Sequence, residues 1–165
     1  MNLTTAARMP RLPALLSAAF PARTPDGQRI LQAIAAVEGD VPTADELAVE
    51  LGYDNRHQMA RAMMRAGLPP LEHVSGWAML LGWTARSEQD GITLCELAAE
   101  YKRDPAVCYR LTKRLTGKVW TEVVKLGTGW LVATVRQRYG YAPLTAAQVP
   151  TRRRSGDNER PLVKT

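Results

Sequence analysis

The chain has 165 residues, 45% of them hydrophobic and 23% charged, a composition typical of one ordinary globular domain or of two very small ones. No apolar run approaches the roughly 18 residues that a membrane-spanning helix requires, and two cysteines without a characteristic spacing argue against a disulfide framework. We therefore expect a soluble, cytoplasmic protein with reduced thiols and no place in a membrane.

The net charge of +6 is distributed unevenly along the chain. Residues 41–90 hold four arginines and seven acidic residues, a net charge of −3, whereas residues 91–140 hold nine basic and four acidic residues, a net charge of +5. A concentration of positive charge favours a polyanionic partner such as nucleic acid, because neutralised phosphates release their counterions. A solvated basic surface is the alternative interpretation.

Residues 1–23 are expected to form an N-terminal arm. The segment imitates a secretory signal, with two early arginines, a short apolar stretch from Leu12 to Phe20 and small residues near Ala22. Pro13 interrupts the apolar stretch, which is also at the short end of the range for signal peptides. We therefore expect a loosely ordered arm with one or two helical turns.

Sequence signals for the starts and ends of helices recur from Thr24 to Tyr139, and no alternating strand pattern occurs. This predicts an all-α fold of about seven helices. Helix caps, prolines in first turns and glycines after last turns delimit these helices. The expected helices cover about residues 24–39, 43–51, 55–65, 70–86, 93–101, 105–115 and 119–138. The last helix contains Gly127 and Gly129 and is expected to bend there. Domain boundaries follow at residues 24 and 140, and residues 141–165 are expected to form a disordered basic tail.

Two of these helices are near copies of each other. Residues 43–51 read TADELAVEL and residues 93–101 read TLCELAAEY, with Thr, Glu, Leu, Ala and Glu at the same places. A turn and a second helix follow each copy. A short helix, a tight turn and a second helix with a polar, basic free face form a helix-turn-helix unit. The sequence thus predicts two units, about 43–67 and 93–117, joined by a long linker helix.

The second helices of the two units differ slightly in register. Met59 matches Cys108 and Met63 matches Thr112 with an offset of 49, whereas the first helices match with an offset of 50. One extra residue is therefore expected in the first turn, where insertions are tolerated.

Basic residues lie on the expected free face of both second helices. In a helix-turn-helix unit the first helix braces the second, and the second enters the major groove of DNA. An exposed arginine there can donate two hydrogen bonds to a guanine edge. The residues on the free faces are Arg56, His57, Ala60 and Arg61 in the first unit and Ala106, Val107, Tyr109, Arg110 and Lys113 in the second.

Two segments, LAVELGYDNRHQMARAMMRAGLPPLEHV and LAAEYKRDPAVCYRLTKRLTGKVWTEV, resemble the DNA-binding module of the AraC/XylS family of bacterial transcription regulators. The resemblance covers about residues 25–125. In the second segment the spacing of Arg110, Leu111, Lys113, Arg114 and Gly117 is similar to a signature of that family, and the first segment has a counterpart. Departures occur as well: Lys102 and Arg103 replace a glycine and an aromatic residue, and Val119 and Trp120 replace a Thr-Pro pair.

The resemblance implies a role for individual residues. Base reading would belong to Arg56, His57 and Arg61 in the first unit and to Ala106, Val107 and Arg110 in the second. Lys113 and Arg114 would lie near phosphates. With Tyr109 from the free face, these residues complete the candidate DNA-binding set. The implied partner is double-stranded DNA, and the implied fold is two helix-turn-helix units joined by a long helix.

No enzyme chemistry stands out, since the chain has no evident nucleophile-base pair, glycine-rich phosphate loop or carboxylate dyad. Two histidines and two cysteines at unhelpful spacings do not predict a metal site, and no cofactor or small-molecule ligand is indicated. We expect a sequence-specific transcription regulator. Two alternatives remain: a helical adaptor that binds a protein such as an RNA polymerase subunit, which the acidic first half favours, or DNA binding through the second unit only.

Overall fold

The computed structural model describes residues 11–145, and this part of the chain is all-α, with eight helices and no strand. The helices are α2 (Leu12–Ala19), α3 (Pro25–Ala36), α4 (Ala44–Glu50), α5 (Arg56–Arg65), α6 (Leu71–Asp90), α7 (Leu94–Glu100), α8 (Pro105–Thr116) and α9 (Trp120–Arg138). The predicted fold class is confirmed. All seven helices expected between residues 24 and 138 are present, and α2 corresponds to the one or two helical turns expected in the N-terminal arm.

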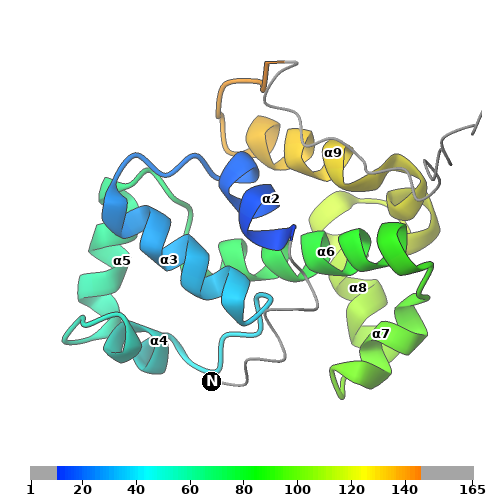
Figure 1. Cartoon of the computed structure of the whole chain (residues 1–165), viewed down its shortest axis with the longest axis horizontal. Helices are drawn as coiled ribbons and strands as arrows, with labels where there is room; N and C mark the ends of the chain where they lie inside the picture. The colour runs from blue at the N-terminus through cyan, green and yellow to red at the C-terminus, as the bar shows by residue number, and fades with distance from the viewer. Residues whose placement is uncertain (1–10, 146–165) are drawn as a thin grey trace, which may run out of the picture.

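The long helix α6 lies at the centre of the molecule, with α4 and α5 towards one end and α7 and α8 towards the other (Figure 1). Every residue from Trp77 to Arg86 is buried, so this stretch is covered on all sides, as a central helix must be. Helices α2, α3 and α9 pack against α6. The Trp77 indole is fully buried and donates a hydrogen bond to the Tyr139 hydroxyl at 3.2 Å.

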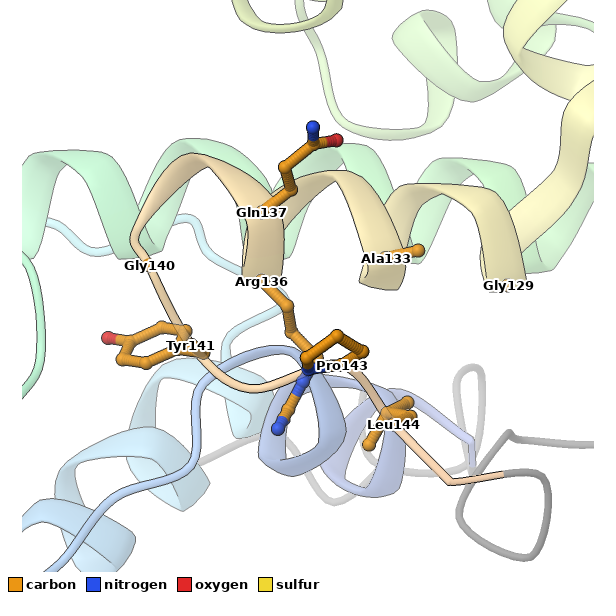
Figure 2. Close-up of a pocket in the computed structure, with 8 residues that line it drawn as sticks. All are labelled: Gly129, Ala133, Arg136, Gln137, Gly140, Tyr141, Pro143 and Leu144. Carbon is orange, nitrogen blue, oxygen red and sulfur yellow. The ribbon is translucent and has the colours of Figure 1, made fainter.

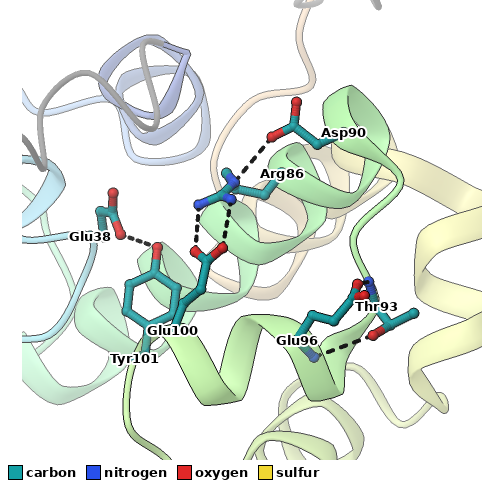
Figure 3. Close-up of polar contacts among 7 residues, drawn as sticks. All are labelled: Glu38, Arg86, Asp90, Thr93, Glu96, Glu100 and Tyr101. Atoms are coloured by element: carbon teal, nitrogen blue, oxygen red, sulfur yellow. Dashed lines mark hydrogen bonds and ion pairs between the residues drawn. The ribbon is translucent and has the colours of Figure 1, made fainter.

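The short capped helices form for local reasons. Thr43 begins α4 by accepting a hydrogen bond from the Glu46 amide at 3.1 Å. Thr93 begins α7 in the same way, and there the Glu96 carboxylate also accepts from the Thr93 amide, which completes a capping box (Figure 3). The two copies of the sequence motif thus fold as two copies of one short helix.

The N-terminal segment differs from the expected arm. Residues Leu12, Leu15, Leu16, Ala19 and Phe20 are completely or almost completely buried, and α2 packs against α3, α6 and α9. Pro13 lies in the first turn of α2, where the missing amide hydrogen costs nothing. Residues 12–20 therefore belong to the core of the domain, while residues 1–10 lie outside the described part.

The domain also extends slightly beyond α9. The Tyr141 hydroxyl donates a hydrogen bond to the Gly67 carbonyl at 2.7 Å. The buried Arg136 guanidinium donates to the Ala142 carbonyl and to the Ala18 carbonyl of α2, each at 2.6 Å. Figure 2 shows the segment through Leu144 folding back beside α9. The remainder of the expected tail, residues 146–165, lies outside the described residues.

Helix α9 is interrupted where the sequence predicts a bend. Gly127 has φ 85° and ψ 178°, which is not helical. After this break the Glu88 carboxylate accepts hydrogen bonds from the Thr128 amide at 2.8 Å and from the Thr128 hydroxyl at 3.1 Å. The Glu88 side chain of α6 therefore accepts a hydrogen bond from the Thr128 amide, which the bend in α9 leaves without a helical partner.

Candidate nucleic-acid interface

The turns of the two units have the same backbone path. Gly52, with φ 84°, follows α4, and Lys102, with φ 53°, occupies the equivalent place after α7. The Tyr53 amide donates to the Ala48 carbonyl at 2.9 Å, and the Arg103 amide donates to the Ala98 carbonyl at 2.8 Å. The left-handed conformation is accessible to glycine and costs other residues about 1–2 kcal/mol. The departure from the family pattern at Lys102 thus preserves the turn.

The second helices begin at side-chain caps. Asn55 accepts a hydrogen bond from the Gln58 amide at 2.9 Å and begins α5. Asp104 accepts from the Ala106 amide at 2.9 Å and begins α8. Between the helices the first turn has five residues, 51–55, and the second has four, 101–104. The extra residue lies in the first turn, as the offset between the copies predicts.

The free faces of α5 and α8 are exposed as the sequence predicts. Met59, Ala62 and Met63 are buried on α5, and Cys108 and Thr112 are buried on α8. The whole candidate set is exposed: Arg56, His57 and Arg61 on α5, and Ala106, Val107, Tyr109, Arg110, Lys113 and Arg114 on α8. The structure therefore brings the candidates together in two groups, one on each second helix.

Charge is separated by helix within each unit. The charged residues of the second helices are all basic: Arg56, Arg61 and Arg65 on α5, and Arg110, Lys113 and Arg114 on α8. Those of the first helices are all acidic: Asp45, Glu46 and Glu50 on α4, and Glu96 and Glu100 on α7. The net charge of −3 over residues 41–90 therefore does not describe α5, whose own charge is positive.

Tyr109 is held differently from its neighbours on α8. Its hydroxyl lies 3.8 Å from the Cys95 thiol of α7, and the hydrogen bond to Cys95 raises the pKa of Tyr109. The ring is therefore directed towards the first helix of its own unit. Ala106 and Val107 are the apolar positions that remain free in the first turn of α8.

A polar network, which the sequence patterns did not single out, joins α7 to α6 (Figure 3). The buried Arg86 guanidinium donates to both carboxylate oxygens of Glu100, at 3.0 and 3.2 Å, and lies 3.3 Å from the Asp90 carboxylate. Burial acts to lower the pKa of Arg86, but the hydrogen bond and the negative charge of Glu100 outweigh it and raise the pKa. Two charge-assisted bonds thus fix the C-terminal end of α7.

Two further contacts join the second turn to the segment between α3 and α4. The Tyr101 hydroxyl donates to the Glu38 carboxylate, and the Arg103 guanidinium donates to the Asp40 carboxylate at 2.6 Å. Each pair is separated by 63 residues in sequence. No periodicity or short motif relates residues so far apart, so sequence patterns could not identify these contacts.

Replacing Tyr101 with phenylalanine should make folding less sensitive to alkaline pH. Burial, the hydrogen bond to Glu38 and the charges of Glu38 and Glu100 raise the pKa of Tyr101 well above its usual range, against the opposing charge of Arg86. The raised pKa contributes stability that is complete below the unfolded-state pKa of about 10 and is lost as the pH rises further. Urea unfolding between about pH 8 and pH 11 should therefore show that the free energy of unfolding falls more steeply with pH for the wild type than for Tyr101→Phe. Parallel declines would contradict this role for Tyr101.

The surface formed by the described residues has several hollows, and two of them border α5 and α9. A groove of about 480 Å³ borders α5 and the start of α6, lined in part by Met63, Met64 and Leu71. A second, of about 570 Å³, lies against α9 beside Arg136 and Tyr141 (Figure 2). Arg136 already donates hydrogen bonds to two carbonyls, so its role there is to hold the segment after α9 and the end of α2 in place.

Within residues 11–145 no cluster of three or more potential metal ligands occurs, and none of the described helices is long and apolar enough to cross a membrane.

The described fold is an all-α domain with two helix-turn-helix units placed at the two ends of a central helix. No protein-family model matches the chain, and comparisons with curated proteins and with solved structures gave no match. The resemblance to the AraC/XylS family stays a prediction from the sequence motifs.

Proposed function

We propose that the protein is a cytoplasmic, sequence-specific transcription regulator that binds duplex DNA by inserting α5 and α8 into the major groove. The observation that carries this proposal is the charge separation in both units: each second helix is exposed and purely basic, and each first helix is purely acidic. Positive charge on the exposed helix attracts phosphates, and its arginines have the geometry to read guanine.

Roles on α8 follow from the position of each side chain. In helix-turn-helix proteins the N-terminal part of the second helix contacts base edges. Ala106, Val107 and Arg110 occupy one face of that part, and Val107 is 43% exposed. An apolar side chain suits a thymine methyl group, and arginine suits guanine. Lys113 and Arg114, one turn further along, are suited to phosphates.

The first unit has the equivalent arrangement with Arg56, His57 and Arg61 on the exposed face of α5. Two units in one chain would let a monomer read a bipartite site without dimerising. Successive major-groove segments on one face of the duplex are about 34 Å apart, so the two second helices would need this spacing when bound.

A second candidate function is protein binding by the first unit. Met64 is 73% exposed on α5 and borders the groove between α5 and the start of α6. Exposed methionines suit adaptable apolar contacts. In this version α8 alone would hold DNA, and the first unit would bind a partner such as an RNA polymerase subunit.

Salt dependence of DNA affinity tests the proposal and separates the two versions. We expect the wild type to bind duplex DNA at low salt in a band-shift titration. Arg65 on α5 is exposed and matches Arg114 on α8 at the offset of 49. Arg65→Ala should therefore reduce the slope of log K against log salt by about 1, and Lys113→Ala/Arg114→Ala should reduce it by up to about 2.

The control variant is Arg138→Gln, which removes a positive charge from α9, where the guanidinium lies over the Trp77 ring. Its slope should equal that of the wild type. An effect confined to Lys113 and Arg114 would support binding through the second unit only. Absence of wild-type binding at low salt would refute the proposed function.

A further inference from the structure

The two contacts between the turn of the second unit and the segment after α3 form an inter-unit clamp. It consists of the bond from Tyr101 to Glu38 and the ion pair of Arg103 with Asp40. Glu38 is 4% exposed, whereas Asp40 and Arg103 lie nearer the surface. The clamp thus has one partly buried contact and one more exposed contact.

The clamp joins the second unit directly to residues 37–43, the segment that leads into α4 of the first unit. In the first unit α5 packs on α3 and α4, and in the second α7 packs on α8. The principal contacts of the second unit with the rest of the domain are with α6 and α9. A direct contact away from the axis of α6 restrains rotation of one unit relative to the other about that axis.

The backbone conformation of residues in and beside the clamp supports a specific role for it. Within the described residues, Glu38 with φ 55° and Lys102 with φ 53° are the non-glycine residues that adopt positive φ. Lys102 has the conformation that Gly52 has in the turn of the first unit, whereas Glu38 belongs to the clamp. Such conformations persist where the surrounding contacts over-determine them, and they concentrate at functional sites.

The end of α7 is fixed from a second side as well. Glu100, the residue before Tyr101, accepts two hydrogen bonds from the buried Arg86 of α6 (Figure 3). The second turn is therefore held between α6 and the segment after α3. Exposed ion pairs add little stability, so most of the restraint comes from the Tyr101–Glu38 bond, and the Arg103–Asp40 pair adds a second point of attachment.

We propose that the inter-unit clamp is a positioning device that fixes the second unit relative to the first and thereby sets the spacing of the bipartite DNA site that the protein accepts. The part of this proposal that concerns DNA rests on the proposed function. The part that concerns the two units does not, and it can be measured without DNA.

Distances between spin labels test the mechanical part. Labels at Val49→Cys on α4 and Ala99→Cys on α7, both exposed, report the separation of the units. The background carries Cys95→Ser, since Cys95 is exposed and Cys108 is buried. We expect one narrow distance distribution with the clamp intact. The double variant Tyr101→Phe/Arg103→Ala should give a broader or multiple distribution.

Two further variants control for general loss of structure. Exchanging the charges in Asp40→Arg/Arg103→Asp, with Tyr101 retained, should restore the narrow distribution. Asp26→Asn, which breaks an ion pair within α3, should leave it unchanged. A narrow, unshifted distribution in the variant without the clamp would overturn the proposal, whether or not its melting temperature falls.

Spacing of the DNA site tests the functional part. The duplex selected from a random pool is remade with the spacer between half-sites changed by one base pair, about a tenth of a helical turn. The wild type should lose affinity at least about tenfold, comparable to one good base contact. The variant without the clamp should lose much less, and the charge exchange should restore the penalty.

The outcomes separate the two proposals. If the wild type binds no duplex selectively, the proposed function fails, while the label distances still decide whether the clamp fixes the units. If the wild type binds selectively but both proteins show the same spacing penalty, the clamp does not set the spacing.

Discussion

Replacing Arg110 with alanine is expected to weaken binding to a selected duplex by about 1–3 kcal/mol while changing non-specific affinity little. Arg110 is exposed on α8, one helical turn after Ala106. In the described part of the chain no ion pair involves its side chain, so the guanidinium is available to a guanine edge. Loss of that contact should affect only duplexes that carry the matching base.

Band shifts at one salt concentration, with the selected duplex and with a scrambled duplex, measure this effect. Arg110→Lys keeps the charge but lacks the planar pair of donors, and we expect it to behave nearly as alanine does on the selected duplex. Arg114→Ala should weaken binding to both duplexes about equally. A uniform loss for Arg110→Ala on all sequences would instead assign Arg110 to phosphate contact.

Replacing Phe20 with alanine is expected to lower the free energy of unfolding by about 3–5 kcal/mol. Phe20 is fully buried at the end of α2, with its ring centroid 5.8 Å from that of Tyr139 and 6.4 Å from that of Tyr141. This loss is a large part of the free energy of unfolding of a typical domain, which is about 5–15 kcal/mol.

Urea unfolding followed by circular dichroism measures the loss. Ser17→Ala is the matched control, because Ser17 lies on the exposed side of the same helix and should change stability by no more than about 0.5 kcal/mol. If Phe20 lay on a loosely ordered arm, both variants would behave alike. Equal unfolding midpoints for the two variants would therefore contradict the packing of α2.

The helices of the two units were predictable because their signals are local. Thr43, Asn55, Thr93 and Asp104 each cap a helix by a bond to a residue two or three positions ahead. The apolar spacing on α5 and α8 likewise identifies a buried face within one helix. Exposure of the candidate DNA-binding residues follows from the same periodicity, and the structure confirms that exposure.

The burial of the first helix was missed although its signal was present. Leu12, Leu15, Leu16 and Ala19 have the spacing of one apolar helix face. Pro13 was taken to interrupt the apolar run, whereas it lies in the first turn of the helix. What buries this face is α3, α6 and α9, and a short apolar run does not reveal whether distant helices will cover it.

The sequence by itself determined the helices, the duplicated unit and the faces that carry basic residues, because caps and periodicity act within one or two helical turns. Tertiary structure alone decided that the apolar face of residues 12–20 is core and that Arg103 pairs with Asp40. These features depend on side chains that are distant in sequence and adjacent only after the helices have packed.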